Sequence, residues 1–394
     1  MKNEFKRIWT LTLCAVLLVM ASCSSDDNPN EPTTENVAAT LLDCDLFLED
    51  LILTDNPDAP VDYIINCHAA VKGKLTIEPG VVIHYGKDAR LRFMEGSSFS
   101  AIGTADKPIV MTGTESSPGW WEGILFLNTN FGNIMEYVEI SYGGGQTYNG
   151  HGHASVVVYS GSALTMKNSI ISHSEETAFE ARYNNTFINI KNNRFSQNVQ
   201  PLIINYLNAH EVSATNDYTG NNLDKVLLIP ESGAIVDPVK WEHINVPYRS
   251  MGDINIATDG KLTLEPGVVI EMTSGSRFKV IDGSLSIIGT QESPITIRGK
   301  ESGPGSWRGI FINSENPNNI QFATISDTGE EPLENKGAVD LWYNASLSII
   351  ATTFKDAAAC GVYGRLLPGQ DENPNYSYSG LTMINTACGQ LFEH

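Results

Sequence analysis

The sequence predicts an all-β fold, a solenoid of short stacked strands built from two tandem copies of one unit. Two observations carry this prediction. Residues 74–83 (KLTIEPGVVI) recur as residues 261–270 (KLTLEPGVVI), 187 positions further along (261 − 74), with nine of the ten residues identical. Elsewhere, apolar and polar residues alternate in runs of three to five, which is the pattern of strands, with turn residues between them.

The repetition continues in the same order beyond this stretch. Residues 121–124 (WEGI) match residues 307–310 (WRGI) at an offset of 186, and Leu164 matches Leu347 at an offset of 183. Small changes of offset indicate insertions or deletions in loops while the strands keep their order, as solenoids tolerate.

Each element of the repeated stretch has a structural role. Leu75 and Ile77 alternate, a Pro-Gly pair turns the chain, and Val81 and Ile83 alternate again. Strands this short cannot bury enough apolar surface alone, so successive coils must stack about 4.8 Å apart around one core. Hydrophobic residues make up 41% of the chain, which is enough for such a core.

These matches predict the domain boundaries. The first copy is expected over residues 41–230, with residues 41–53 as a cap over the first coil, and the second copy over residues 231–394. We expect one long rod with a break near residues 230–247, where the second copy begins.

The N-terminal residues have the pattern of a signal peptide, which predicts that the protein is exported. Residues 1–22 have a basic front and a short apolar core, too short to span a bilayer. The following Cys23, preceded by small residues, resembles the lipobox cysteine of bacterial lipoproteins, which is lipidated. An acidic Ser-Ser-Asp-Asp after it resembles the tag for the outer face of the outer membrane in Bacteroides-type bacteria. Residues 23–40 then form a disordered tether. The alternative is an ordinary leader with a chance cysteine.

The repeated pattern also carries a family resemblance. Leu-Thr-Ile-Glu-Pro-Gly-Val-Val-Ile, followed by Gly-Thr, Pro-Ile, Trp-x-Gly-Ile and Asn-Ile, resembles the right-handed parallel β-helix proteins of the pectin-lyase-like superfamily over about residues 60–394. The resemblance implies a right-handed parallel β-helix. It implies less about activity, because one fold hosts many functions.

The four cysteines beyond the leader and the lipid site favour disulfides at the two ends of the rod. Cys44 and Cys67 are 23 residues apart, and Cys360 and Cys388 are 28 apart, each about one coil. Neighbouring coils would bring each pair within disulfide reach in an oxidising compartment. The alternative is that each pair stacks unbridged in the core.

The net charge of the chain limits the classes of molecule that it can bind. A formal charge of −21 without Lys or Arg clusters argues against nucleic acid. Ca²⁺ is the only cofactor to consider, and its candidate ligands around the start of the second copy are Asp253, Asp259, Asp282, Glu242 and Glu265. We interpret these residues as structural instead, because Glu265 is matched by Glu78 within the repeated stretch. The expected partners are the outer membrane, through the lipid, and a polysaccharide, and we expect a monomer.

No complete catalytic constellation is evident. The Gly-His-Gly at His151 resembles part of the polygalacturonase motif, but the accompanying aspartate elements are absent. His151, His153 and His173 offer a weak metal site, for which solvated loop histidines are the alternative.

Aromatic residues supply the candidates for glycan binding, because aromatic faces stack on sugar rings. Trp121 and Trp307 occupy matched positions, so we interpret both as parts of the coil. The candidates are the aromatic residues without such a match: Trp120, Tyr142, Tyr148, Tyr159, Trp342, Tyr343 and Tyr363.

The sequence therefore predicts a surface-anchored β-helical lipoprotein that binds a glycan or another surface component without catalysis. A polysaccharide lyase or hydrolase and a structural spacer are the alternatives. Function is expected where the two copies differ.

Overall fold

The computed structural model describes residues 37–146, 152–331 and 334–394. The predicted leader, the lipidation site Cys23, most of the tether, Tyr148 and His151 lie outside these residues. From Val37 onward the chain forms one compact unit.

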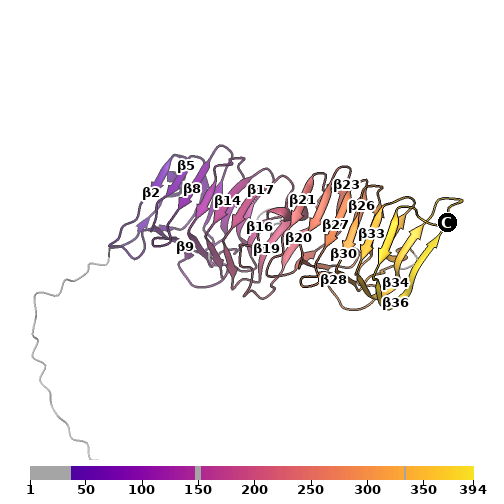
Figure 1. The fold of residues 1–394 in the computed structure, drawn as a ribbon. Helices are drawn as coiled ribbons and strands as arrows, with labels where there is room; N and C mark the ends of the chain where they lie inside the picture. Colours follow the sequence, from indigo (N-terminus) through magenta and orange to yellow (C-terminus); the bar gives the residue numbers. More distant parts are fainter. Residues whose placement is uncertain (1–36, 147–151, 332–333) are drawn as a thin grey trace, which may run out of the picture. The chain divides into compact units, whose positions relative to one another are not determined.

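This unit is an all-β parallel solenoid of about 13 turns, as the sequence predicts. Its coils follow one another from the indigo to the yellow end of the ribbon (Figure 1). Each regular coil contributes one strand to each of three walls, and strands of successive coils pair in parallel.

One wall, here called the long wall, extends from the first coils to the last. Its strands are β4 (His68–Val71), β7 (Arg90–Phe93), β10 (Gly123–Phe126), β13 (Ala154–Val158), β16 (Thr177–Ala181), β19 (Gln200–Asn205), β20 (Val226–Ile229), β22 (Tyr248–Ser250), β25 (Val269–Met272), β28 (Ile295–Gly299), β31 (Ala323–Ser326), and the beginnings of β34 (Thr353–Arg365) and β36 (Thr382–Glu393).

Two further walls complete the N-terminal half. Side wall A contains β1 (Thr40–Leu41), β3 (Tyr63–Ile65), β6 (Val82–Tyr85), β9 (Ile109–Gly113), β12 (Val138–Ser141), β15 (Ile170–Ser172) and β18 (Arg194–Ser196). Side wall B contains β2 (Leu51–Leu53), β5 (Lys74–Ile77), β8 (Ser98–Ile102), β11 (Ile134–Glu136), β14 (Ala163–Lys167) and β17 (Phe187–Lys191).

Two different walls complete the C-terminal half. Side wall C contains β21 (Pro238–Trp241), β24 (Lys261–Leu264), β27 (Ser284–Ile288), β30 (Asn319–Gln321), β33 (Leu347–Ile350) and β35 (Tyr376–Ser379). Side wall D contains β23 (Ile254–Ala257), β26 (Arg277–Ile281), β29 (Gly309–Asn313), β32 (Gly337–Trp342) and the ends of β34 and β36.

The repeated stretch takes the same local structure both times. β5 and β24 share one burial pattern, with alternate residues in the core. The turn glycines Gly80 and Gly267 have φ of 93° and 89°, a conformation that side chains disfavour. Trp121 and Trp307 are fully buried, and their indole N–H groups donate to the carbonyls of Ser141 and Ser326. These residues therefore build the coil.

The matched strands nevertheless lie on different walls. β6 belongs to side wall A, whereas its sequence counterpart β25 belongs to the long wall. β7 belongs to the long wall, and its counterpart β26 belongs to side wall D. The second matched segment is thus turned by one wall about the solenoid axis relative to the first. The change occurs between β20 and β22, across which the long wall continues without interruption.

Asparagines stabilise the corners in two ways. Asn168 and Asn192 adopt positive φ of 51° and 57°, which asparagine tolerates. Asn193 is buried and forms a ladder: its side-chain oxygen accepts from the Ser169 N–H at 3.0 Å, and its own backbone N–H donates to the Asn216 side chain at 2.8 Å. Buried backbone groups between coils are satisfied in this way.

Disulfides join the end coils. Cys44 bonds to Cys67 and Cys360 to Cys388, with Cα atoms 6.3 and 4.3 Å apart, and these are the pairs expected from the spacing. At the N-terminal end a short 3-10 helix, η1 (Cys44–Leu48), carries Phe47, which is completely buried over the first coil. A second 3-10 helix, η2 (Tyr206–Glu211), lies next to the break.

Candidate functional site

The outer face of side wall D concentrates aromatic and charged side chains near Trp342. In β32, Val339 and Leu341 are fully buried in the core, so the alternating strand directs Asp340 and Trp342 outward. Asp340 lies in register with Tyr363, and Trp342 with Arg365, on the next coil. Stacked coils thereby join residues that are more than twenty positions apart in sequence.

Trp342 separates two cavities. One of about 460 Å³ is lined by Asp282, Asn313, Ser314, Glu315, Asn316, Trp342, Tyr343, Asn344, Ala345 and Leu367. The other, of about 300 Å³, is lined by Glu334, Lys336, Trp342, Tyr363, Arg365, Glu393 and His394. We call them the amide cavity and the charged cavity. Both lie within or at the lower limit of the size range of small-ligand pockets.

The Trp342 ring is held by its neighbours. Its centroid lies 5.0 Å from that of Phe311 and 5.8 Å from that of Tyr343, both nearly perpendicular to it. The Arg365 guanidinium lies 5.2 Å from the same ring, a cation–π contact. The indole is therefore fixed in place yet partly exposed, as a stacking platform requires.

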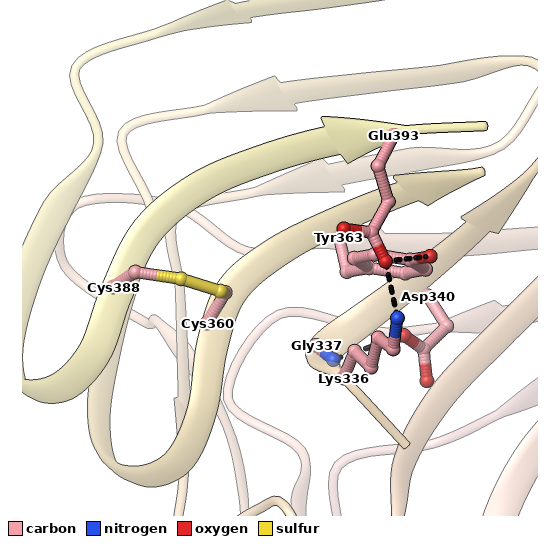
Figure 2. Close-up of a disulfide and its surroundings, with 7 residues drawn as sticks. All are labelled: Lys336, Gly337, Asp340, Cys360, Tyr363, Cys388 and Glu393. Atoms are coloured by element: carbon pink, nitrogen blue, oxygen red, sulfur yellow. Dashed lines mark hydrogen bonds and ion pairs between the residues drawn. A yellow bond between two sulfur atoms is a disulfide. The ribbon is translucent and has the colours of Figure 1, made fainter. Parts of the chain in front are cut away.

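Glu393 organises the charged cavity (Figure 2). Its carboxylate accepts hydrogen bonds from the Lys336 ammonium and, at 2.9 Å, from the Tyr363 hydroxyl. The bond from Lys336, together with that from Tyr363, holds the pKa of Glu393 below its usual range. Glu393 is consequently an ionised acceptor at neutral pH.

The pKa of Asp340 is shifted in the opposite direction to that of Glu393. Only 6% of it is exposed, and burial raises its pKa to about 7, despite a 2.9 Å hydrogen bond from the Gly337 N–H and the nearby charges of Arg277 and Lys336. One wall thus holds a carboxyl that gains and loses a proton near neutrality beside one that remains ionised. Such pairs are typical of acid–base sites and are also found in structural networks.

The aromatic residues predicted from the sequence to bind a glycan do not form one cluster in the structure. Trp342 and Tyr343 share the amide cavity. Trp120 is half-buried and donates its indole N–H to the Thr114 hydroxyl at 2.8 Å. Tyr142 stacks on His173, and the ring of Tyr159 is tilted against that of Tyr183, with centroids 4.7 Å apart. Neither tyrosine lines the cavities at Trp342.

The histidines already have partners. The ring of His153 lies 2.7 Å from the Glu175 carboxylate, and that of His173 lies 3.2 Å from the Ser172 hydroxyl. Among the described residues, no three His, Cys, Asp or Glu side chains are grouped closely enough to hold a metal ion.

Three of the five carboxylates considered for Ca²⁺ have separate partners. Glu265 pairs with Lys240 at 2.5 Å, Glu242 accepts from the Ala214 N–H at 2.7 Å, and Asp253 accepts from the Arg277 N–H at 3.0 Å.

The sequence singled out Tyr363 as an unmatched aromatic residue, but it did not reveal Lys336, Asp340 and Glu393 as its neighbours. The signal that was available is the spacing of about one coil between residues 336 and 363 and between 363 and 393, the same kind of spacing that pairs the cysteines. Without the coil register, it could not show which of these residues point outward.

No protein-family model matches the chain, and neither a curated protein nor a solved structure matches it significantly. Within the described ranges, no helix has the length and apolar character needed to cross a membrane.

Proposed function

We propose that this protein binds a glycan in the two cavities around Trp342 without cleaving it. The observation that carries the proposal is the fixed, partly exposed indole between a cavity lined by amides and hydroxyls and a cavity lined by charges. Sugars combine apolar faces with dense hydroxyl groups, so an indole face plus amide and carboxylate partners matches their chemistry. Arg365 and Lys336 add donors for acidic substituents.

The proposal also includes a cellular location and a fold family. Lipidation at Cys23 would anchor the protein to the outer membrane of a Bacteroides-type bacterium, with the solenoid at the cell surface. The resemblance to right-handed, pectin-lyase-like β-helices supports a role in contacting polysaccharides, because a long wall of stacked strands offers an extended surface to a polymer.

Replacing Trp342 tests the binding site. Trp342→Ala is expected to weaken binding at least about 30-fold, the loss typical of a central tryptophan contact. Binding is measured by titration calorimetry against plant and host polysaccharides, after a panel screen has identified a ligand. Trp120→Ala, which removes a half-buried tryptophan in the other half, is the matched control.

Three results would count against this site. Unchanged affinity in Trp342→Ala would exclude it, and loss of affinity in Trp120→Ala alone would place binding in the N-terminal half. If the unmodified protein binds no polysaccharide of the panel, the structural-spacer alternative is favoured instead.

Asp340 supports a second candidate, a polysaccharide hydrolase or lyase. A carboxyl with a pKa of about 7 can donate a proton, and Asp340 lies in register with Tyr363, which lines the charged cavity together with the ionised Glu393. If the protein cleaves glycans, Asp340→Asn should lower kcat about 10²- to 10⁴-fold without affecting ligand affinity.

The measurement is product release from each polysaccharide, with new reducing ends indicating hydrolysis and unsaturated ends indicating elimination. Trp342→Ala is the control, because it should affect KM more than kcat. Intact polysaccharide after long incubation with a protein that binds it would exclude the enzymatic candidate and support binding alone.

A further inference from the structure

A cavity of about 490 Å³ lies where side wall B ends, in the N-terminal half of the solenoid. Its lining comes from the loop after β10, from β14, from β17 with the turn before it, and from η2. β17 is the last strand of this wall, because the next coil places the 3-10 helix η2 against it. The coil pairs with β17 only after the helix, through an isolated bridge between Ile190 and Val212. The depression therefore follows from the end of the wall.

Two exposed phenylalanines line this cavity. Phe131 is 68% exposed and Phe187 48%, and their ring centroids lie 4.9 Å apart with the rings tilted by 58°. Phe187 is in register with Ala163 on β14, whose small side chain leaves room beside the ring. At the offset that matches residues 121–124 with 307–310, Phe131 corresponds to Pro317 (131 + 186), so this aromatic residue is not part of the repeated coil. Exposed apolar residues grouped at a cavity indicate a binding surface.

The loop that carries Phe131 is held in place by buried asparagines. Asn128 and Asn133 are completely buried on either side of it. The Asn128 amide donates to the Ser97 carbonyl at 2.9 Å, and the Asn133 amide donates to the Asn128 side-chain oxygen at 2.8 Å and to the Ala163 carbonyl at 3.0 Å. An exposed ring on a fixed loop loses little conformational entropy when a ligand binds.

Amides and hydroxyls supply most of the polar groups of the cavity. The Asn208 amide on η2 donates to the Thr186 carbonyl at 3.2 Å and to the Thr186 hydroxyl at 2.6 Å, which fixes the helix against the turn before β17. Asn189, in register with Thr165, also lines the cavity, and its buried side-chain oxygen has no hydrogen-bond partner among the described residues. A buried acceptor without a donor is unusual, and a ligand rich in hydroxyls would bring donors to this position.

The cavity differs in charge from the charged cavity at Trp342. Among the described residues that line it, only His210 and Glu211 are ionisable, and their side chains pair with each other at 3.3 Å. Phenyl rings and amides without unpaired charge fit a neutral sugar, which has an apolar ring face and hydroxyl groups around its edge. A purely apolar partner would leave the amide groups without hydrogen-bond partners.

We propose that this cavity is a second glycan-binding site, which takes neutral sugar residues against the rings of Phe131 and Phe187. The proposal extends the function proposed above, but the site shares no lining residue with the cavities at Trp342. Either site can therefore be lost without the other. The site at Trp342 offers cations to acidic substituents, whereas the site at Phe131 and Phe187 selects uncharged sugars.

The test is titration calorimetry of residues 24–394, which contain the whole compact unit from Val37 onward, with neutral oligosaccharides of glucose, xylose, mannose and N-acetylglucosamine. At least one should bind, and Phe131→Ala and Phe187→Ala should each raise its dissociation constant at least about 10-fold. Because neither the ligand nor the cavity presents an unpaired charge, the affinity should be the same at low and high salt. If none of these oligosaccharides binds, the proposal is overturned, whether or not other glycans bind at Trp342.

Ile52→Ala is the matched control. Ile52 is 62% exposed on β2, at the other edge of side wall B from β17, and its replacement should leave the affinity unchanged. Trp342→Ala should also leave the affinity for these oligosaccharides unchanged, which separates a failure of this site from a failure of the site at Trp342. Full affinity in both phenylalanine variants, or its loss in Trp342→Ala, would overturn the assignment. So would phenylalanine variants that change only the oligomeric state, because the two rings would then form a contact between chains.

Discussion

Replacing Glu271 by alanine is expected to lower the free energy of unfolding by about 3–5 kcal/mol, the range found when one member of a buried ion pair is removed. Glu271 is 4% exposed on the long wall. Its two oxygens accept from Arg249 at 2.6 and 2.9 Å, from Arg298 at 2.7 Å, and from Lys225 at 3.1 Å. The alanine variant leaves three cations close together without their shared carboxylate.

The pH dependence of this contribution has a definite sign. Burial alone would raise the pKa of Glu271, but the hydrogen bonds from Arg249, Arg298 and Lys225 outweigh it, and the pKa lies below 4.5. A carboxyl whose folded-state pKa is lowered stabilises the fold above its unfolded pKa and loses that effect as the pH falls through the folded value. The difference between the two proteins should therefore disappear in acid.

Urea denaturation followed by circular dichroism measures this effect between neutral and acidic pH. Glu265→Ala is the matched control, because Glu265 forms an exposed pair with Lys240 and such pairs contribute about 0–1 kcal/mol. A cost below about 1 kcal/mol for Glu271→Ala would contradict the role of the cluster.

Asp340→Asn is expected to stabilise the protein at pH 8 by about 2–4 kcal/mol and to have little effect near pH 4. Burial raises the pKa of Asp340 from 3.8 to about 7. A carboxyl with a raised folded-state pKa has no effect when both states are protonated, and it destabilises the fold progressively as the pH rises through that window. Asparagine removes the charge and keeps the oxygen that accepts from Gly337.

Melting temperatures from pH 4 to pH 8 provide the measurement. Asp217→Asn should act in the opposite direction: burial raises its pKa, but hydrogen bonds from Thr219 and Asn245 outweigh this and lower it overall. A pH-independent difference for Asp340→Asn would show that this carboxyl is not buried as described.

The sequence was a good guide to the coil and a poor guide to the site. Leu75 and Ile77 face the core as their alternation predicts, and Trp121 and Trp307 are buried as their matched positions predict. These properties depend on local period and on repetition, both visible in one dimension. Trp342 and Tyr343 could be selected as unmatched aromatics, but their shared cavity could not be foreseen.

The charged cavity depends on which residues of different coils share a register. Asp340, which lies beside this cavity in register with Tyr363, appears in the sequence as one acid among many, in an alternating strand with Val339 and Leu341. Its special character arises from burial beside Tyr363 on the next coil, and loop lengths that vary between coils conceal that neighbour. The period of a strand can be read from the sequence, whereas the environment of a side chain depends on which residues of neighbouring coils stack against it.

Because the matched strands lie on different walls, the second matched segment is rotated about the solenoid axis relative to the first. With three walls per coil, a displacement by one wall corresponds to about a third of a turn, so loops that follow matched strands face different directions in space. A straight polymer lying along one side would meet the loops of only one matched segment. The outward surfaces of the two matched segments therefore lie on different sides of the solenoid.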